Sequence, residues 1–420
     1  PIADIEQADI GSLLDRIGDA RVVLLGEATH GTSEFYRMRA RITKELILRH
    51  GFNFIAVEAD WPDAARINQY VRQEPVRQEQ WKAFARFPTW MWRNHEVLEM
   101  VEWIRAWNAE QREPQRRTSF HGLDLYSLFT SINAVITYLG GVDPAMAAIA
   151  RRRYGCLSPW EHDPPVYGRA VLSGRYHDCE SAVVAMLREM LNRRIEYSQR
   201  DGDSFFDAAQ NARLVAAAER YYRVMYYGSA ESWNLRDQHM FDTLERLLEF
   251  HGPESKGIVW EHNSHVGDAA ATEMSARGEH NVGQLSRARF ADSAFLLGFG
   301  TDHGTVAAAS DWDGPMEVKR IRPAHEASYE RLCHDSGVAA FMLHLREPAR
   351  QDVRDELEAA RLERAIGVVY RPESELASHY FQACLPRQFD EYIWFDETRA
   401  VSPLSAIAAH GVPETYPFGV

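Results

Sequence analysis

A glutamate and a histidine lie close together in the stretch GEATHG, residues 26–31. Glu27 could orient His30 and stabilise its charged form, and His30 could accept a proton from water or from a hydroxyl group. The same pattern also fits a polar loop after a buried strand, in which Thr29 or Thr32 caps the next helix. Taken alone, the stretch leaves acid–base chemistry and helix capping equally open.

Three further apolar segments end in side chains of the same kind. They end in Glu58 and Asp60, in His121 and Asp124, and in Glu261, His262 and His265. In open α/β sheets, the functional site lies at the carboxyl ends of the strands. If the four segments are neighbouring parallel strands, their polar ends meet at one edge of the sheet, so we expect a single site built from all four.

Each of these residues also has a plain structural interpretation. Glu58 could cap a helix that begins near Pro62, and Asp124 could be an N-cap. His121 could simply bond to neighbouring backbone. If the chain becomes helical after this strand, His262 and His265 lie on the same face of the helix. Two imidazoles in that arrangement could bind either a metal ion or an anion.

The elements that must position these residues follow from the apolar patterns. A continuous run at 22–25 and another at 54–60 are typical of strands buried on both faces, and helical spacing over 33–50 lies between them. We therefore expect parallel pairing of these two strands with a right-handed crossover. Further strands are predicted at 118–124, 257–263, 293–300, 305–310, 338–345, 366–370 and 391–397.

Helical patterns fill most of residues 62–112 and 126–250. The fold class is thus α/β, with a mostly parallel central sheet flanked by helices and a large helical insertion or lobe over the carboxyl ends of the strands. We expect one catalytic domain, with a first α/β half at 1–125, the helical insertion at 126–250 and a second α/β half at 251–420.

The composition limits the classes of molecule that the protein is expected to bind. The chain of 420 residues carries 61 acidic and 47 basic residues, a net charge of −14, which argues against nucleic acid as the main partner. No stretch approaches the length of a membrane span, and the first residues lack the apolar core of a signal peptide. Four widely spaced cysteines without a CxxC pair predict reduced thiols in a cytoplasmic protein, with no disulfide framework.

Several catalytic signatures are absent from the sequence. It contains no GxSxG elbow, no GxxxxGK[ST] loop, no HExxH motif and no GxGxxG opening a helix. Without a serine or cysteine nucleophile, a His–Glu pair would act by activating water directly. The same residues could instead hold a divalent metal, which lowers the pKa of a bound water molecule.

Five motifs resemble the erythromycin esterase family. They are GEATHGTSEFYRMR at 26–39, VEADWPDA at 57–64, FPTWMWRN at 87–94, SWNLRDQHM at 232–240 and WEHNSHVGD at 260–268. The resemblance spans roughly residues 20–400. It implies an α/β fold with a helical lobe and hydrolysis of an ester or lactone, with a macrolide macrolactone as one candidate substrate.

The resemblance also implies roles for individual residues. His30 would activate water with Glu27 as its partner, Glu58 would match the acidic position of the second strand, and His262 and His265 would stabilise the oxyanion. Substrate-binding candidates are Arg39, His121, Asp124, Arg236 and Asp237, although Arg39 and Arg236 also fit surface or ion-pair roles. No cofactor is expected.

Two alternatives remain at this point. One is a metal-dependent hydrolase that uses His30, Glu58, His262 and His265 as ligands. The other is a member of the family that binds a ligand without altering it. The expected partner is a small-molecule ester or lactone, and the sequence does not give the oligomeric state.

Overall fold

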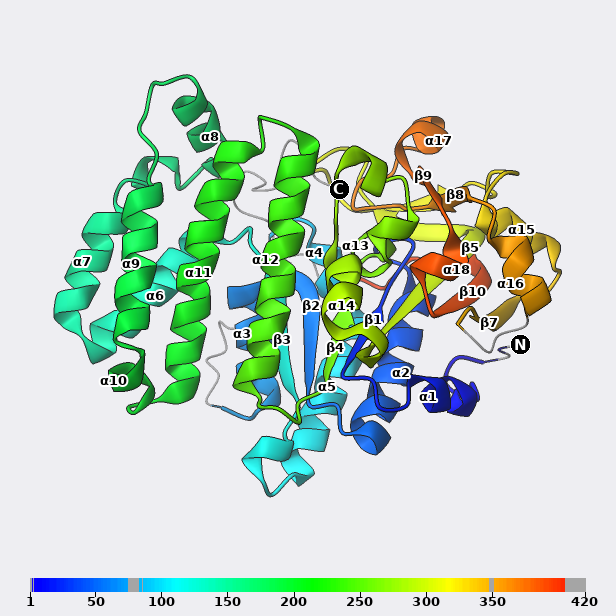
Figure 1. Cartoon of the computed structure of the whole chain (residues 1–420), viewed down its shortest axis with the longest axis horizontal. Helices are drawn as coiled ribbons and strands as arrows, with labels where there is room; N and C mark the ends of the chain where they lie inside the picture. The colour runs from blue at the N-terminus through cyan, green and yellow to red at the C-terminus, as the bar shows by residue number, and fades with distance from the viewer. Residues whose placement is uncertain (1, 3, 75–82, 85, 347–350, 405–420) are drawn as a thin grey trace.

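A mostly parallel sheet forms the centre of the chain in the computed structural model, which describes residues 2, 4–74, 83–84, 86–346 and 351–404 (Figure 1). The strand order is β3-β2-β4-β1-β5-β10-β7, with β6 paired to β5. The bounds are β1 (Val22–Leu25), β2 (Phe54–Asp60), β3 (Ser119–Asp124), β4 (Gly257–Trp260), β5 (Ala294–Ala308), β6 (Glu317–Ile321), β7 (Ala340–His344) and β10 (Glu391–Thr398). Only β6 and β7 run antiparallel to their neighbours in this sheet.

The four strands that end in acidic residues and histidines are indeed parallel neighbours. One detail of the expected pairing is wrong, however: β1 and β2 do not pair with each other, because β4 lies between them. The crossover through α2 (Ser33–His50) skips one strand position, and β4 fills that position much later in the chain. A strand–helix–strand pattern predicts the parallel direction but not the number of positions that the crossover spans.

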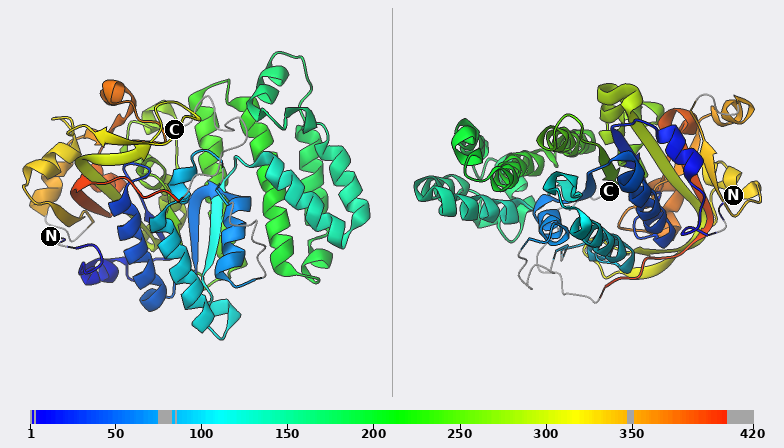
Figure 2. Two further views of the ribbon diagram at one scale, coloured as in Figure 1. Left: turned by 180° about the vertical axis from the view of Figure 1, so that it is seen from behind. Right: turned by 90° about the horizontal axis from the view of Figure 1, so that it is seen from below.

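Both faces of the sheet are covered, which explains the uninterrupted apolar runs. Val22 and Leu24 belong to one apolar cluster and Val23 and Leu25 to another, on the opposite face. The second cluster includes side chains of α1 (Gly11–Ile17), α2 and α5 (His95–Glu110). Figure 2 shows α2 and α5 on the face of the sheet opposite to α12 (Ser229–Phe250) and α14 (Val282–Phe290).

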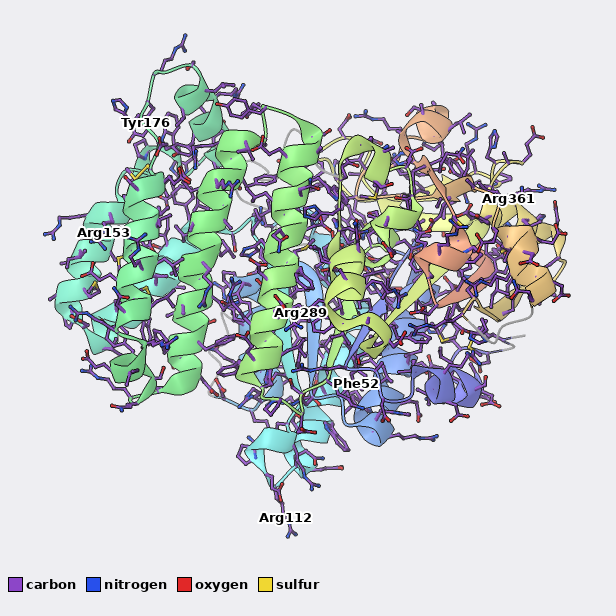
Figure 3. All side chains as sticks on the ribbon, in the orientation of Figure 1. Phe52, Arg112, Arg153, Tyr176, Arg289 and Arg361 are labelled. Carbon is purple, nitrogen blue, oxygen red and sulfur yellow. A yellow bond between two sulfur atoms is a disulfide. The ribbon has the colours of Figure 1, made fainter. Side chains whose placement is uncertain are left out.

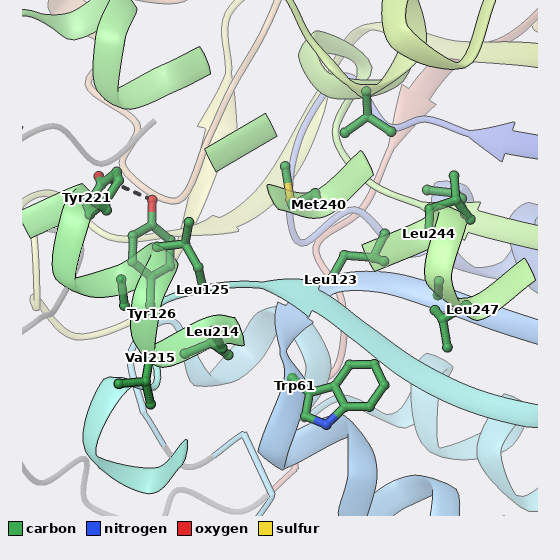
Figure 4. Packing of buried hydrophobic residues seen from close by; sticks show 14 of the residues in the cluster. Trp61, Leu123, Leu125, Tyr126, Leu214, Val215, Tyr221, Met240, Leu244 and Leu247 are labelled. Atoms are coloured by element: carbon green, nitrogen blue, oxygen red, sulfur yellow. Dashed lines mark hydrogen bonds between the residues drawn. The ribbon is translucent and has the colours of Figure 1, made fainter. Parts of the chain in front are cut away.

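The helices between β3 and β4 form a lobe beside the β3 edge of the sheet (Figures 1 and 2). They are α6 (Leu128–Val142), α7 (Pro144–Tyr154), α8 (Pro164–Leu172), α9 (Glu180–Asn192), α10 (Arg194–Ser198), α11 (Gly202–Val224) and α12. Apolar side chains of α11 and α12, including Leu214 and Leu244, pack with Leu123 and Trp61 (Figure 4). The start of α12 and the end of α11 extend the lobe to the carboxyl ends of the strands.

The remaining elements lie before and after the lobe in the sequence. The helices are α3 (Trp61–Val71), α4 (Thr89–Trp92), α13 (Asn263–Val266), α15 (Tyr329–Asp335), α16 (Gln351–Leu357), α17 (Glu375–Ser378) and α18 (Leu385–Gln388). A separate two-stranded sheet joins β8 (Arg361–Arg364) to β9 (Tyr380–Ala383).

Two strand predictions after residue 300 need correction, and two charged strands there were not predicted. The segment 305–310 is no separate strand, because β5 continues through it to Ala308. The segment 366–370 forms only isolated bridges, to Thr29 and Ala309. The charged strands β6 and β8 escaped prediction because they lack the apolar runs that mark the central strands.

The prediction of reduced thiols is wrong for one pair of cysteines. Cys156 and Cys179 form a disulfide in the lobe, next to Tyr176 in Figure 3. Folding brings a residue that follows α7 against the residue that precedes α9, a contact that sequence spacing does not reveal. Cys333 and Cys384 are free. Among the described residues, no helix is both long and apolar enough to cross a membrane.

Candidate active site

The loop after β1 is held rigidly against a neighbouring segment. The backbone N–H of His30 donates to the carbonyl of Ile366 at 3.0 Å, and Ile366 donates to Ala28 at 2.9 Å. Gly31 has a φ of 73°, and a Cβ at this position would collide with the carbonyl oxygen of Ala307. The conformation of the GEATHG loop is therefore fixed by backbone contacts as well as by its side chains.

His30, Glu27 and Arg39 form a chain of buried hydrogen bonds. His30 Nδ1 lies 2.8 Å from Glu27 Oε1, and Arg39 Nη2 donates to Glu27 Oε2 at 2.9 Å. Arg39 packs over the rings of Tyr36 and Trp260 and is fully buried. When Glu27 accepts a hydrogen bond from Nδ1–H, the imidazole of His30 has its lone pair on Nε2, which has no hydrogen-bond partner among the described residues.

This arrangement gives Arg39 a supporting position. Arg39 does not line the cavities described below, so its role in substrate binding stays a prediction. It fixes the second oxygen of Glu27. Thr32, which the sequence offered as a cap for α2, makes no side-chain capping bond.

Glu58 lies at the centre of a second buried network. Its Oε1 accepts from Arg236 Nη2 at 2.8 Å, and its Oε2 accepts from the backbone N–H of His262 at 2.9 Å. Burial opposes the charge on Glu58, but His265 and Arg236 outweigh burial and hold the pKa of this carboxyl well below its ordinary value. Glu58 is thus a buried anion that links Arg236 of α12 to His262, which follows β4.

His265 is held as a cation between carboxylates. Its Nδ1 lies 2.9 Å from Asp237 Oδ1, and its Nε2 lies 3.4 Å from Glu58 Oε1. Burial disfavours the charged form, but Asp237 and Glu58 overcome this and raise the pKa of His265 to about 10. Nη1 of Arg236 lies 3.2 Å from the same Nε2, so the guanidinium borders the ring of His265.

His262 differs from His265 although the two lie one helical turn apart. Its Nδ1 accepts from the backbone N–H of Ser264 at 3.2 Å, and its Nε2 lies 3.2 Å from the carbonyl of Ala28. Burial and the proximity of His30 keep the pKa of His262 well below its ordinary value. It is therefore a neutral imidazole that donates to backbone, with its ring centroid 4.9 Å from that of His30.

Glu261, which the sequence grouped with these histidines, has a different environment. It is fully buried, and neither of its carboxylate oxygens has a hydrogen-bond partner among the described residues. Burial, reinforced by Glu58 and Asp237 against the opposing effect of His265, raises its pKa well above the ordinary value. Glu261 is a neutral carboxylic acid beneath the charged network.

Arg236 joins the third strand to this network. It donates two hydrogen bonds to Asp124, from Nε at 3.0 Å and from Nη2 at 2.7 Å, in addition to its bond with Glu58. Arg236 is therefore a buried ion-pair residue that also faces the cavity. Asp60 lies nearby but pairs with Arg86 and accepts from the backbone of Tyr126.

His121 is the one candidate that lies apart from the others. It occurs in the middle of β3 rather than at its end, stacks on Trp61 at 5.4 Å and contacts His251 Nε2 at 3.2 Å. It lines neither cavity, so the structure does not bring it together with the other candidates, and its role in substrate binding stays a prediction. Alternation along the strand directs His121 and Asp124 to opposite faces.

A cavity of about 320 Å³ opens above this network. His30, Arg236, His262 and His265 line it, together with residues from the start of α12 and from the 365–381 segment. A smaller cavity of about 80 Å³ lies on the other side of the site. Because His30, Arg236 and Tyr126 line both, these three residues separate one chamber from the other.

Several cavity residues were not identified from the sequence. The ring of Trp233 stacks on His265 at 4.5 Å with an interplanar angle of 5°, and Tyr126 and Tyr221 approach each other through their hydroxyls at 3.4 Å (Figure 4). Trp233 could have been found, since it precedes Arg236 and Asp237 by one helical turn. Tyr221 carried no such signal.

The donor atoms of this cluster do not match a metal site. Both nitrogens of His262 contact protein groups, and Asp237 and Glu58 flank those of His265. Both oxygens of Glu58 accept hydrogen bonds, and the guanidinium of Arg236 occupies the space between. Only Nε2 of His30 remains open, whereas catalytic zinc sites use three protein ligands.

The fold and the network together define an α/β protein with a histidine–glutamate pair at the carboxyl ends of parallel strands. The sequence profile of the erythromycin esterase family matches residues 47–398. The chain belongs to this family.

Individual relatives are distant. A Bacillus subtilis (strain 168) protein named "Putative hydrolase YbfO" is 21% identical over 90% of this chain and 83% of its own length. The erythromycin esterase type II of Escherichia coli is 28% identical over 28% of this chain and 26% of its own length.

Solved structures share the fold across nearly the whole chain. A Bacillus cereus protein matches with a TM-score of 0.80 at 20% identity, covering 96% of both chains. A mutant of the erythromycin esterase EreC in its open conformation matches with a TM-score of 0.70 at 17% identity, covering 95% of this chain and 97% of that one. A protein described as a succinoglycan biosynthesis protein matches with a TM-score of 0.77 at 22% identity, covering 96% and 95%.

Proposed function

We propose that this protein hydrolyses a carboxylic ester or lactone by direct attack of water. The observation that carries the proposal is the His30–Glu27 pair: Nδ1 is bonded to a buried carboxylate, and His30 lines the cavity with Nε2 unpartnered. A histidine in this state is suited to take a proton from water. Membership of the erythromycin esterase family supports the same reaction class.

The proposed reaction has two steps. Water bound beside His30 attacks the carbonyl carbon and gives its proton to Nε2, while Glu27 stabilises the imidazolium that forms. The oxyanion of the tetrahedral intermediate lies near the positive charges of His265 and Arg236, which favour it because they are preorganised in a buried site. His30 then returns the proton to the leaving alkoxide, which yields an acid and an alcohol, joined in one molecule when the substrate is a lactone.

The test is a substrate screen with the purified full chain. Macrolides such as erythromycin, small esters and lactones are incubated with wild type, and mass spectrometry detects addition of one water molecule. We expect turnover of at least one compound, loss of turnover in His30→Gln, and unchanged turnover in His162→Ala, which alters an exposed histidine of the lobe.

Three results would contradict the proposal. Unchanged turnover in His30→Gln would remove His30 as the base. Thermal stabilisation by a compound that is never altered would instead support a ligand-binding member of the family. A third result would be activity that a chelator abolishes and a divalent ion restores. If this activity were unchanged in His30→Gln, it would support metal-dependent hydrolysis.

A further inference from the structure

A second group of histidines and carboxylates lies outside the cavity, on the other half of the sheet. Its members, referred to as the His–Asp cluster, are Asp302, His303, His334 and Asp396. They come from three different elements: β5, α15 and β10. None of them lines either cavity of the candidate active site.

The two carboxylates are brought together by the register of the sheet. In the parallel pairing of β5 with β10, Thr301 pairs with Phe395 and His303 pairs with Glu397. Asp302 and Asp396 therefore occupy equivalent positions on adjacent strands and face the same side. In the part of the chain that the structure describes, no lysine or arginine forms an ion pair with either carboxylate.

Two imidazoles complete the group. His334, on α15, has its Nδ1 2.7 Å from Asp396 Oδ1 and 3.6 Å from Asp302 Oδ2. His303 follows Asp302 directly in β5, with its Nδ1 2.9 Å from Asp302 Oδ2. One candidate ligand atom from each of the four residues lies within 4.8 Å of the others.

These distances between the ligand atoms suit a metal ion with tetrahedral coordination. Around zinc, with bonds of about 2.0 Å to histidine nitrogen and carboxylate oxygen, neighbouring ligand atoms lie about 3.3 Å apart. Asp302 is nearly buried, with a side chain 3% exposed, and is further fixed by a hydrogen bond from the backbone of Ala324 at 3.1 Å. The two imidazoles are about one-third exposed, so an ion can enter and they can turn to meet it.

We propose that the His–Asp cluster binds one divalent transition-metal ion of the zinc type. The ion stabilises the fold rather than taking part in hydrolysis, because it joins α15 and β10 to β5 and none of its four ligands lines a cavity that contains His30. Binding of a metal to the folded state alone raises stability by mass action. The inference does not depend on the proposed esterase activity.

The test uses the full chain after chelator treatment and dialysis. Zinc is added and measured by calorimetry and by elemental analysis, and Co²⁺ is added as a spectroscopic probe of tetrahedral His–carboxylate ligation. We expect one equivalent of metal, a visible Co²⁺ absorption band and a higher Tm with zinc. His334→Ala and Asp396→Asn should lose all three, whereas His162→Ala and His30→Gln should keep them.

The controls separate this site from the catalytic one and from loose surface binding. His162→Ala removes an exposed histidine elsewhere, and His30→Gln removes the base of the candidate active site. If α15 does not tolerate the change at His334, His303→Gln gives the same readout at a more exposed position. Absence of saturable binding in wild type, or full binding in both Asp396→Asn and His303→Gln, would overturn the proposal.

Discussion

Nδ1 of His30 lies 2.8 Å from Oε1 of Glu27, and both residues are almost completely buried. The two side chains come from one short loop, so their geometry depends on the turn at Gly31 and on the bonds to Ile366 rather than on packing between distant elements. The carboxylate can thus fix the tautomer of the imidazole and stabilise its charged form.

Replacing Glu27 with Gln tests this pairing. The amide oxygen can still accept from Nδ1, but it cannot stabilise the imidazolium, and its NH₂ group would face Arg39. We expect kcat for ester hydrolysis to fall by about 10²–10³ with little change in KM, within the usual contribution of general base catalysis. Glu245→Gln, at an exposed carboxylate of α12, is the control and should keep wild-type kinetics. Equal rates for the two variants would argue against the pairing.

Replacing Arg236 with Met tests the ion-pair network. The change leaves the buried carboxylates of Asp124 and Glu58 without their main partner. Breaking a buried ion pair in this way costs about 3–5 kcal/mol of unfolding free energy, measured by urea denaturation. The matched control is Arg289→Met, because Arg289 forms an exposed pair with Glu245 that is worth about 0–1 kcal/mol. A similarly small loss of unfolding free energy in Arg236→Met and Arg289→Met would contradict the buried network.

The charge on His265 predicts a pH dependence of stability. The pKa of His265 is about 10 in the folded chain and about 6.5 when unfolded, so the folded state binds the proton more tightly. The resulting stabilisation is fully present below pH 6.5 and is lost as the pH rises through 10. Unfolding free energies of wild type and His265→Gln should therefore converge between pH 7 and pH 10, with a slope no steeper than about 1.4 kcal/mol per pH unit. A difference that stays constant over this range would mean that His265 is neutral in the fold.

The sequence predicted the mostly parallel sheet and the meeting of four strand ends, but not the order of the strands. Four apolar runs with polar ends were sufficient to predict that Glu27, Glu58, Asp124 and His262 lie at one edge of the sheet. Parallel strands are buried on both faces, and functional side chains lie at their carboxyl ends. The order of the strands was not accessible, since β4 enters between β1 and β2 from a distant part of the chain.

The states of individual side chains depended on tertiary contacts. His262 and His265 look equivalent in the sequence, yet one donates to backbone as a neutral ring and the other is charged between carboxylates. His121 lies apart from the other candidates because it occurs within β3 rather than beyond its end. The pairing of Cys156 with Cys179 likewise arises from helix packing that no local pattern records.

Chemical rescue of a His30→Ala variant tests the central claim most directly. The substitution leaves an imidazole-sized space beside the carboxylate of Glu27, and exogenous imidazole can occupy it. Hydrolysis of the substrate found in the screen should fall by about 10²–10⁴ in kcat/KM and recover in part as imidazole is added, because the added base can take the proton from water. Undiminished hydrolysis by His30→Ala without imidazole would contradict the assignment of His30 as the base.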